Sequence, residues 1–396
     1  MEIVPLLVIL FPAASVLILV LPIRGTRKFN HVSPASRYHE ADAVLSRRLL
    51  TPGTGSYESY YREHPGLKDK DDLSRQSPGL LSPAARNYHP ATFSASRANF
   101  HVIEHLGHLT HENPVSNAIT GTDPEKNSRF ITRWMTSTGA SDVGFTPLKE
   151  YHLYSHKGRG PLAGMPVQND HPHAIAFTVE MDHAMMQPAP AGTAVMESSE
   201  QYLRSGILAL KLAAFIRELG YEATAHIDGN YEVICPLVAA DAGLGTIGRM
   251  GLLMTPRLGP RVRIAVVTTS LPVKYSTGRP DPTILHFCHL CKKCARNCPV
   301  SAIPRGSRVK YDGIPRWRIN SEKCYHFWTV TGTDCGRCIT VCPYSHPDNL
   351  FHRLVRRGIK NNLVFRYLAV KLDDVFYGRE PRVRPLPAWV DMMDKP

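Results

Sequence analysis

The stretch that decides the fold is Cys288-His289-Leu290-Cys291-Lys292-Lys293-Cys294-Ala295-Arg296-Asn297-Cys298-Pro299. Its four cysteines are separated by two, two and three residues, and a proline follows the last one. In bacterial ferredoxins this spacing lets three thiolates hold one 4Fe-4S cluster while the fourth binds a second cluster. The stretch therefore predicts one half of a two-cluster ferredoxin-like domain.

The other half follows along the chain within 45 residues, as Cys324, Cys335, Cys338 and the pair Cys342-Pro343. The crosswise order of bacterial ferredoxins groups the eight thiolates into two sets. One cluster is expected on Cys288, Cys291, Cys294 and Cys342, and the other on Cys298, Cys324, Cys335 and Cys338. The alternative is a pair of zinc sites, which leaves the proline-ended spacing unexplained.

Composition describes an ordinary globular protein. The 396 residues are 43% hydrophobic and 20% charged, which is enough for two domains with a sizeable core. An excess of 47 Lys and Arg over 34 Asp and Glu gives a net charge of +13, which suits nucleic acid, anionic lipid or an acidic partner. No basic run is interleaved with aromatic residues, so no nucleic-acid partner is expected. The ninth cysteine, Cys235, lies in an apolar run and is expected in the core, leaving no disulfide framework and favouring a reducing compartment.

The first 28 residues predict a transmembrane anchor. Residues 3 to 23 carry no charge, and 21 residues are enough to cross a bilayer core. Arg24, Arg27 and Lys28 follow directly, and the positive-inside rule then places the rest of the chain in the cytoplasm. The expected location is the cytoplasmic membrane, with a single pass and the catalytic part on the cytoplasmic side. A cleaved signal peptide is the alternative, but the start Met1-Glu2 lacks a positive charge before the apolar run.

Residues 29 to 126 are expected to form an irregular N-terminal arm, because Ser, Pro, Arg and His are frequent and apolar periodicity is sparse. Within it, His101, His105 and His108 are spaced along one helical face. They suit a metal, but the nearby Gly107 and Pro114 weaken the helix that this spacing assumes. A polar surface stripe is the preferred interpretation.

Strand and helix signals then alternate over residues 127 to 284. Helices are expected at about 127 to 138, at 200 to 219 and within 239 to 251. Strands are expected to begin near Ser141, to cover Ile175–Met181 and Arg263–Thr268, and to include Tyr221–Ala225. This order predicts an α/β or α+β domain ahead of a ferredoxin domain at 285 to 350, with residues 351 to 396 packing on the core.

The glycine-rich stretch Ala242–Leu253, with Gly259–Arg263 after it, resembles the corrinoid-dependent reductive dehalogenases and their relatives, the epoxyqueuosine reductases. The two-cluster block follows some 37 residues later, and ten residues separate Cys324 from Cys335, a stretched spacing typical of that family. Leu372–Gly378 and Pro385–Trp389 are further matches, so the resemblance covers about residues 127 to 389.

The resemblance implies an α+β fold in which a nitroreductase-like α/β domain holds base-off cobalamin, and in which two 4Fe-4S clusters relay electrons to the cobalt. The residues expected to bind the cofactor are Gly243, Gly245, Gly248, Arg249 and Gly251. The chain lacks the Asp-x-His-x-x-Gly pattern of cobalamin enzymes that supply an axial histidine.

The resemblance also implies a tyrosine that donates a proton, and Tyr202 occupies its place. A neighbouring cation would stabilise the phenolate; Arg263 is the first candidate, with Arg261 and Arg249 behind it. The alternatives are a surface tyrosine and a set of anion-binding arginines. Possible walls of the substrate pocket are Tyr151, Tyr154, Phe177, Met185 and Met186.

The function implied is an oxidoreductase that cleaves the carbon–halogen bond of an organohalide. No fused reductase module is present, so electrons are expected from reduced ferredoxin, flavodoxin or a membrane redox partner. The twin-arginine export signal of respiratory relatives is also absent, which argues against a role outside the cell. Two other functions remain open: epoxyqueuosine reduction, and electron transfer by a membrane-tethered iron–sulfur protein without a corrinoid.

Overall fold

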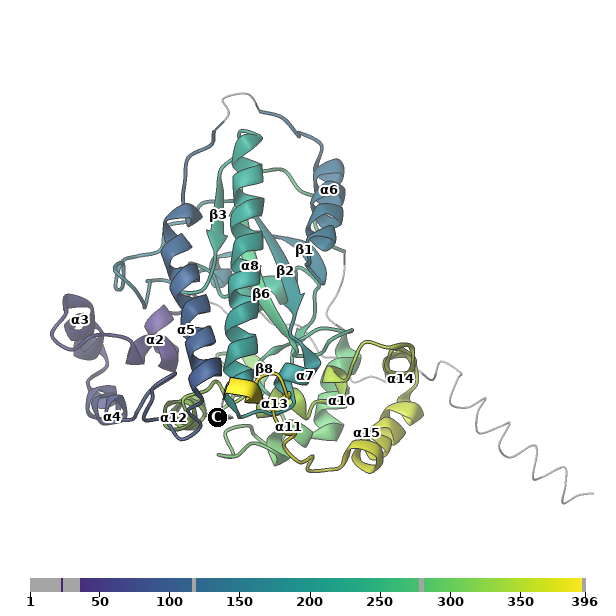
Figure 1. Ribbon diagram of the computed structural model, residues 1–396. Helices are drawn as coiled ribbons and strands as arrows, with labels where there is room; N and C mark the ends of the chain where they lie inside the picture. Colours follow the sequence, from purple (N-terminus) through teal and green to yellow (C-terminus); the bar gives the residue numbers. More distant parts are fainter. Residues whose placement is uncertain (1–22, 24–35, 116–118, 278–280, 394–396) are drawn as a thin grey trace, which may run out of the picture.

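The computed structural model describes residue 23 and residues 36–115, 119–277 and 281–393 (Figure 1). The predicted membrane anchor, apart from Ile23, lies outside these residues. Among the residues described, no helix is both long enough and apolar enough to cross a membrane.

A four-stranded sheet forms the centre of the larger half. Its order is β1 (Asp142–Pro147), β2 (His173–Glu180), β6 (Val262–Thr269) and β3 (Ala223–His226). Every neighbouring pair is antiparallel, with Phe177 opposite Val143 on one side and Ala265 on the other. The domain is therefore α+β, and the α/β alternative is wrong.

Helices cover both faces of this sheet. Ile175 and Phe177 of β2 share one core with α6 (Pro124–Ser137) and α8 (Gly192–Glu218). Ala174 and Ala176 point to the opposite face, because side chains alternate along a strand, and pack there with α9 (Cys235–Asp241), which also carries the buried Cys235. The strand is buried on both faces, which explains its continuous apolar sequence.

Helix α8 begins eight residues before the predicted start at Glu200. Its first turns bury Thr193, Glu197, Ser198 and Ser199. Because these buried residues are polar, this part of the sequence has no apolar periodicity that would predict a helix. Tyr202 consequently lies in the third turn of α8 and not at its start.

The prediction of an irregular arm over residues 29 to 126 is wrong for the part described. This segment contains four α-helices: α2 (Val44–Arg48), α3 (Gly55–Glu63), α4 (Pro65–Arg75) and α5 (Pro90–His105). Figure 1 shows α5 running alongside α8. His101 and His105 lie on α5, His108 follows in a 3₁₀ turn, and all three are exposed, as expected of a surface stripe.

The buried faces of these helices explain why the pattern was missed. Helix α5 approaches α8 at two glycines: a Cβ on Gly206 would lie 2.2 Å from Ile103 Cδ1, and one on Gly192 would lie 2.1 Å from Thr92 Oγ1. Helices α2 and α4 are joined by Arg47, whose Nε donates to the fully buried Asp71 carboxylate at 2.5 Å. Small residues and ion pairs therefore replace the large apolar stripe that sequence analysis relies on.

The cysteine-rich half lies at one end of the sheet and is mostly helical (Figure 1). Its elements are α10 (Pro282–Cys291), α11 (Lys293–Arg296), β7 (Val309–Tyr311), β8 (Ile314–Arg316), α12 (Ser321–Thr331) and α13 (Arg337–Thr340). Short elements join the halves: α7 (His183–Met186), β4 (Thr246–Ile247) and β5 (Leu253–Met254).

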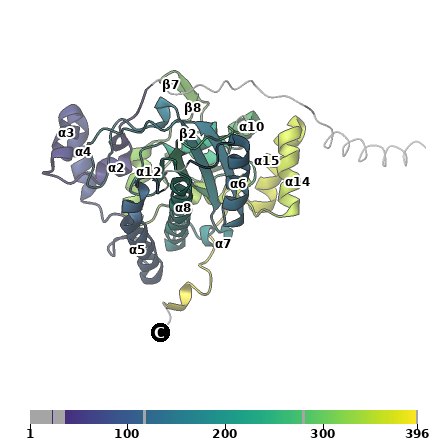
Figure 2. The ribbon, with the colours of Figure 1, turned by 90° about the horizontal axis from the view of Figure 1, so that it is seen from above.

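Two C-terminal helices, α14 (Leu350–Asn361) and α15 (Leu363–Tyr377), pack against α10. Asp373 of α15 pairs with the buried Lys293 of α11 and with His346 Nε2 at 2.7 Å. In both ribbon views these helices lie at the opposite end of the molecule from α3 and α4 (Figure 2).

Candidate active site

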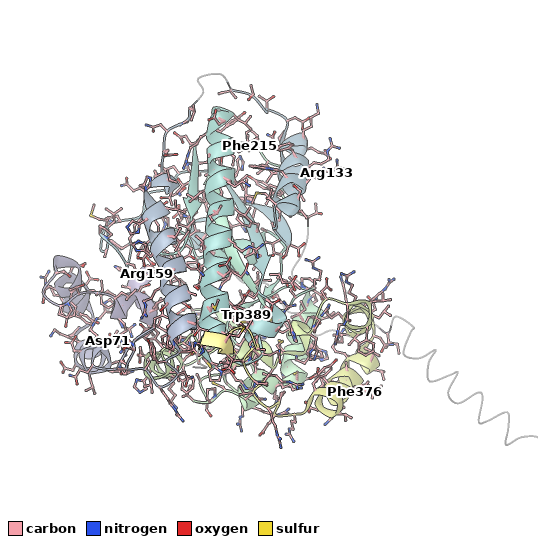
Figure 3. All side chains as sticks on the ribbon, in the orientation of Figure 1. Asp71, Arg133, Arg159, Phe215, Phe376 and Trp389 are labelled. Carbon is pink, nitrogen blue, oxygen red and sulfur yellow. The ribbon has the colours of Figure 1, made fainter. Side chains whose placement is uncertain are left out.

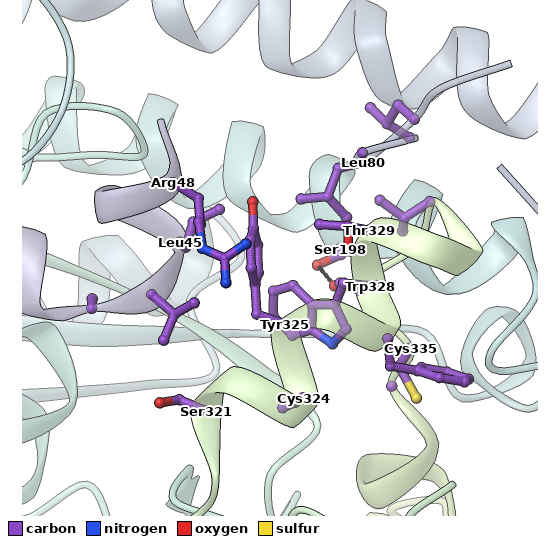
Figure 4. Close-up of a pocket in the computed structure, with 18 of the residues that line it drawn as sticks. Leu45, Arg48, Leu80, Ser198, Ser321, Cys324, Tyr325, Trp328, Thr329 and Cys335 are labelled. Carbon is purple, nitrogen blue, oxygen red and sulfur yellow. Dashed lines mark hydrogen bonds between the residues drawn. The ribbon is translucent and has the colours of Figure 1, made fainter. Parts of the chain in front are cut away.

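A cavity of about 1410 Å³ lies where the N-terminal helices, α8 and the cysteine-rich half meet. Its lining is mostly apolar and includes Leu45, Leu80, Phe100, Val195, Leu252, Ile319 and Trp328. Figure 4 shows part of this wall, with Arg48 and Leu80 on the N-terminal side and Tyr325 and Trp328 on α12. Ordinary small-molecule sites occupy about 300–1,000 Å³, so this cavity has room for an unusually large ligand.

Four of the cysteines line this cavity. They are Cys298, Cys324, Cys335 and Cys338, the set that the sequence assigns to one cluster. Cys324 sits in the first turn of α12, and Cys335 returns to the cavity after the helix with a left-handed φ of +57°. The ten residues between these two cysteines are thus mainly α12, the helix that brings Tyr325 and Trp328 to the cavity wall.

The other four cysteines surround a separate small cavity of about 20 Å³. Cys288, Cys291, Cys294 and Cys342 line it together with Met250, Met254 and Phe287. All four are buried, and burial raises the pKa of the Cys291 thiol to about 12. Thiolates there need a bound metal to stay deprotonated.

Within the described part of the chain, no three Cys, His, Asp or Glu side chains are close enough to bind one ion. In a 4Fe-4S cluster each thiolate binds a different iron, so four thiols spread around a cavity suit a cluster.

Tyr202 and Arg263 meet on the wall of the large cavity. The Arg263 guanidinium carbon lies 4.7 Å from the centre of the Tyr202 ring. Arg263 Nη2 also donates to Ser198 Oγ and lies 3.1 Å from Asp334 Oδ2. Of the candidate arginines, Arg263 is the one that the structure brings to Tyr202.

The electrostatics of the pair differ from the expectation. Burial raises the pKa of the Tyr202 phenol above its usual value, and the Arg263 guanidinium only partly opposes that shift. The phenol is therefore protonated at neutral pH, which is the state that a proton donor requires.

The other two arginines do not line the large cavity. Arg249 is fully buried and ties loops of the cysteine-rich half together, donating to the carbonyl oxygens of Cys288 at 3.0 Å and Pro304 at 2.7 Å. Arg261 pairs with Glu180 at 2.8 Å and donates to the carbonyl of Ser345 at 3.0 Å. Both side chains hold backbone segments in place.

The glycines predicted to bind a cofactor are also absent from the cavity wall. A Cβ on Gly248 would lie 2.5 Å from Met254 Cγ and 3.5 Å from Cys288 Sγ. One on Gly245 would lie 2.4 Å from the Met254 carbonyl oxygen. Gly243 and Gly251 adopt left-handed φ values of +82° and +77°. The observed role of this stretch is a tight turn packed behind the enclosed thiol site.

None of the residues proposed as pocket walls lines the cavity. Phe177 and Met186 are buried in hydrophobic cores, and Tyr154 packs against another core. Met185 is buried as well, and Tyr151 donates to Asp241. Much of the wall comes from the segment before residue 105 and from α12, and α8 and the cysteine-bearing loops complete it. A signal existed in the aromatic run Tyr325-His326-Phe327-Trp328, which sits inside the long cysteine spacer.

Known proteins resemble both halves of this chain. A 4Fe-4S dicluster domain family matches residues 287–346. A tetrachloroethene reductive dehalogenase of Sulfurospirillum multivorans is 32% identical over 66% of this chain and 59% of its own length. One from Desulfitobacterium hafniense is 32% identical over 53% of this chain and 39% of its own. An epoxyqueuosine reductase of Staphylococcus aureus is 27% identical over 36% of this chain and 41% of its own.

Solved structures agree in fold. The catabolic reductive dehalogenase NpRdhA, in complex with 3-bromo-4-hydroxybenzoic acid, gives a TM-score of 0.70 at 22% identity, covering 89% of this chain and 49% of that one. A reductive dehalogenase with a B12-dependent mechanism gives 0.71 at 22% identity, covering 92% and 54%. The chain thus spans about half the length of the proteins it matches. It contains a 4Fe-4S dicluster domain, and in sequence and fold it is a homologue of the reductive dehalogenases.

Proposed function

We propose that this protein is a reductive dehalogenase acting on an organohalide, R–X + 2e⁻ + H⁺ → R–H + X⁻. The observation that carries the proposal is that Tyr202, Arg263 and four cluster-type cysteines line one large apolar cavity. The reaction needs an electron source and a proton source at the same carbon, and this cavity offers candidates for both. An electron-transfer protein without a corrinoid has no use for such a cavity.

The cavity suits cobalamin, which the relationship to reductive dehalogenases implies. Its volume exceeds that of ordinary ligand sites, and its apolar wall suits a broad ring. Several residues of the wall also have buried polar atoms for which the described residues provide no hydrogen-bond partner: Arg48 Nη1, Ser74 Oγ, Arg75 Nε, Arg263 Nε and Asp334 Oδ1. These atoms suit the polar side groups of a corrin. When bound, cobalamin would supply a strongly reducing cobalt.

The chain's own residues then have distinct tasks. The Tyr202 hydroxyl holds the proton that the substrate carbon receives as halide leaves. The Arg263 guanidinium, stacked on the ring, stabilises the phenolate that remains. Ser198 and Asp334 hold Arg263 in that position, and the apolar wall excludes water.

Electrons would reach the cavity through the two thiol sites in turn. The enclosed site lies behind the wall, and the other site forms part of it. Cys338 of the second site is an electrostatic neighbour of Cys294 in the first, so the two clusters would lie close together. We propose a separate low-potential donor, either reduced ferredoxin, flavodoxin or a membrane redox partner.

The test is to purify the full chain anaerobically, record its visible spectrum for corrin bands, and measure halide release from a panel of halogenated phenols. We expect corrin absorption beside the broad cluster absorption, and halide release with a low-potential donor. A protein with clusters but no corrin would instead be an electron carrier. If the protein holds a corrin and reduces an epoxide without releasing halide, the proposed substrate class is wrong.

A further inference from the structure

Helix α15 exposes a row of apolar side chains to solvent. Its solvent-facing positions are apolar and recur at helical spacing, as Val364, Tyr367, Leu368, Leu372, Val375 and Phe376. Val375 is 77% exposed and Phe376 70% exposed. The opposite face buries Ala369 and Val370 together with the charged Arg366 and Asp373. A surface helix of a soluble protein normally turns polar residues, and not an apolar row, toward solvent.

Helix α14 extends the same kind of surface. Leu350 is 72% exposed, and Phe351 and Leu354 are also exposed, whereas Ile359 is buried together with the polar His352 and Arg356. We call the exposed apolar side chains of α14 and α15 together the C-terminal apolar face. Scattered exposed apolar residues are ordinary, but an exposed apolar row on each of two packed helices indicates an interaction site.

The buried polar groups show that this orientation is specified. Asp373 pairs with the buried Lys293, and Arg366 Nε donates to the Ile359 carbonyl oxygen at 2.9 Å. Arg356 Nη2 pairs with Asp348 at 2.8 Å. Turning either helix to bury its apolar side would break these pairs and leave charged groups without their partners.

Exposed cations accompany the apolar side chains. They are Arg357, Lys360 and Lys371, and Lys371 lies one turn from both Tyr367 and Val375. Arg353 is exposed as well but pairs with Asp348 at 2.9 Å. An apolar helix face with neighbouring Lys and Arg is the pattern of helices that lie in a lipid interface, where the cations contact anionic headgroups.

The chain itself indicates what covers this face. The Ile23 carbonyl oxygen accepts a hydrogen bond from the Leu363 backbone N–H at 3.1 Å, at the first residue of α15. Ile23 is the last residue of the uncharged run that begins at Ile3 and is long enough to span a bilayer. The C-terminal apolar face therefore begins beside the last residue of that run.

We propose that the C-terminal apolar face rests on the membrane, with its apolar side chains in the acyl boundary and its cations on anionic headgroups. This contact is separate from the N-terminal run and independent of the catalytic function. It would fix the orientation of the enzyme on the bilayer.

The test uses the full chain in vesicles of phosphatidylcholine with and without phosphatidylglycerol. Phe376 is replaced by the photoreactive p-benzoylphenylalanine, and the mass of the adduct after illumination identifies what touches it. The matched control is the same replacement at Phe130 of α6, which is 53% exposed and stacks on Phe215. Figure 3 shows Phe215 and Phe376 far apart on the molecule.

We expect a lipid adduct at position 376 several-fold more abundant than at position 130, and more abundant still with phosphatidylglycerol. A replacement at Tyr367, on the same face, should behave like that at Phe376 and covers the case that one variant misfolds. Iron content checks that each variant carries its clusters. An adduct to a second copy or another protein, or equal lipid adducts at 376 and 130, would overturn the proposal.

Discussion

The two thiol sites use the same residue types in different surroundings. Cys288, Cys291, Cys294 and Cys342 are all buried around a cavity of about 20 Å³. In the other set only Cys335 is buried, and all four cysteines open on the cavity of about 1410 Å³. An enclosed cluster is protected and can only pass electrons on, whereas a cluster on the cavity wall can deliver them to a ligand. Position relative to the cavity, and not ligand type, separates the two roles.

The largest effect is expected from removing one thiol of either site. Cys298→Ala should lose the cavity-facing cluster, keep the enclosed one and abolish halide release, because the last electron carrier is gone. Cys342→Ala should do the converse to the clusters. Iron content and EPR of the reduced variants distinguish the two. Loss of only the Cys288, Cys291 and Cys294 cluster in Cys298→Ala would show that the grouping is wrong.

Tyr202→Phe tests whether the cavity wall supplies the proton as well as the electrons. It removes one hydroxyl and leaves the ring beside Arg263. General acid catalysis contributes about 10² to 10⁴ in rate, so turnover should fall by that factor while both clusters and any corrin are retained. Halide release under a low-potential donor measures it. Undiminished turnover would eliminate Tyr202 as the donor.

Gly248→Ala tests how tightly the enclosed site is packed. The new Cβ would lie 2.5 Å from Met254 Cγ, and overpacking of this kind costs about 1–3 kcal/mol. The variant should lose its cluster absorbance at a lower temperature than wild type. The control is Gly306→Ala in the same half, where no atom lies within 4 Å of the new Cβ. Equal heat resistance of Gly248→Ala and wild type would mean that the turn behind this site can relax.

The smallest effect is a shift in pH dependence. Arg263 lowers the pKa of Tyr202 against the larger effect of burial, so Arg263→Gln should raise that pKa further. The phenol would stay protonated to higher pH, and the alkaline fall in turnover should move to higher pH. Arg263→Lys keeps the charge and should shift the profile less. The measurement is halide release against pH. An unchanged profile in Arg263→Gln would show that Arg263 does not influence the ionisation of the Tyr202 phenol.

Local sequence signals were reliable where a single segment carries the information. The cysteine spacing specified which thiols lie together, because the chain between them is short and the ligand geometry is demanding. The apolar run of β2 and the amphipathic end of α8 were also identified, since burial of each leaves a pattern in its own residues.

Signals failed where burial depends on a partner far along the chain. Helices α5 and α8 pack together at Thr92, Gly192 and Gly206, small residues that show no apolar periodicity. The contact of α2 with α4 depends on the Arg47 and Asp71 ion pair, a composition that suggests a solvated surface until both partners are known. The N-terminal segment was therefore predicted to be irregular, although it forms much of the cavity wall.

The sequence by itself predicted the two sets of cluster thiols and a ferredoxin-like half after a domain of mixed helices and strands. The resemblance to a known family added Tyr202 and a partner arginine, with Arg263 ahead of Arg261 and Arg249. Only the tertiary structure decided that this arginine is Arg263, that the glycine stretch packs behind the enclosed thiols, and that α14 and α15 turn their apolar sides outward. The reason is physical. Thiol spacing and strand hydrophobicity can be recognised within a few residues, whereas a cavity, a stacked guanidinium and an exposed apolar helix face exist only when distant segments meet.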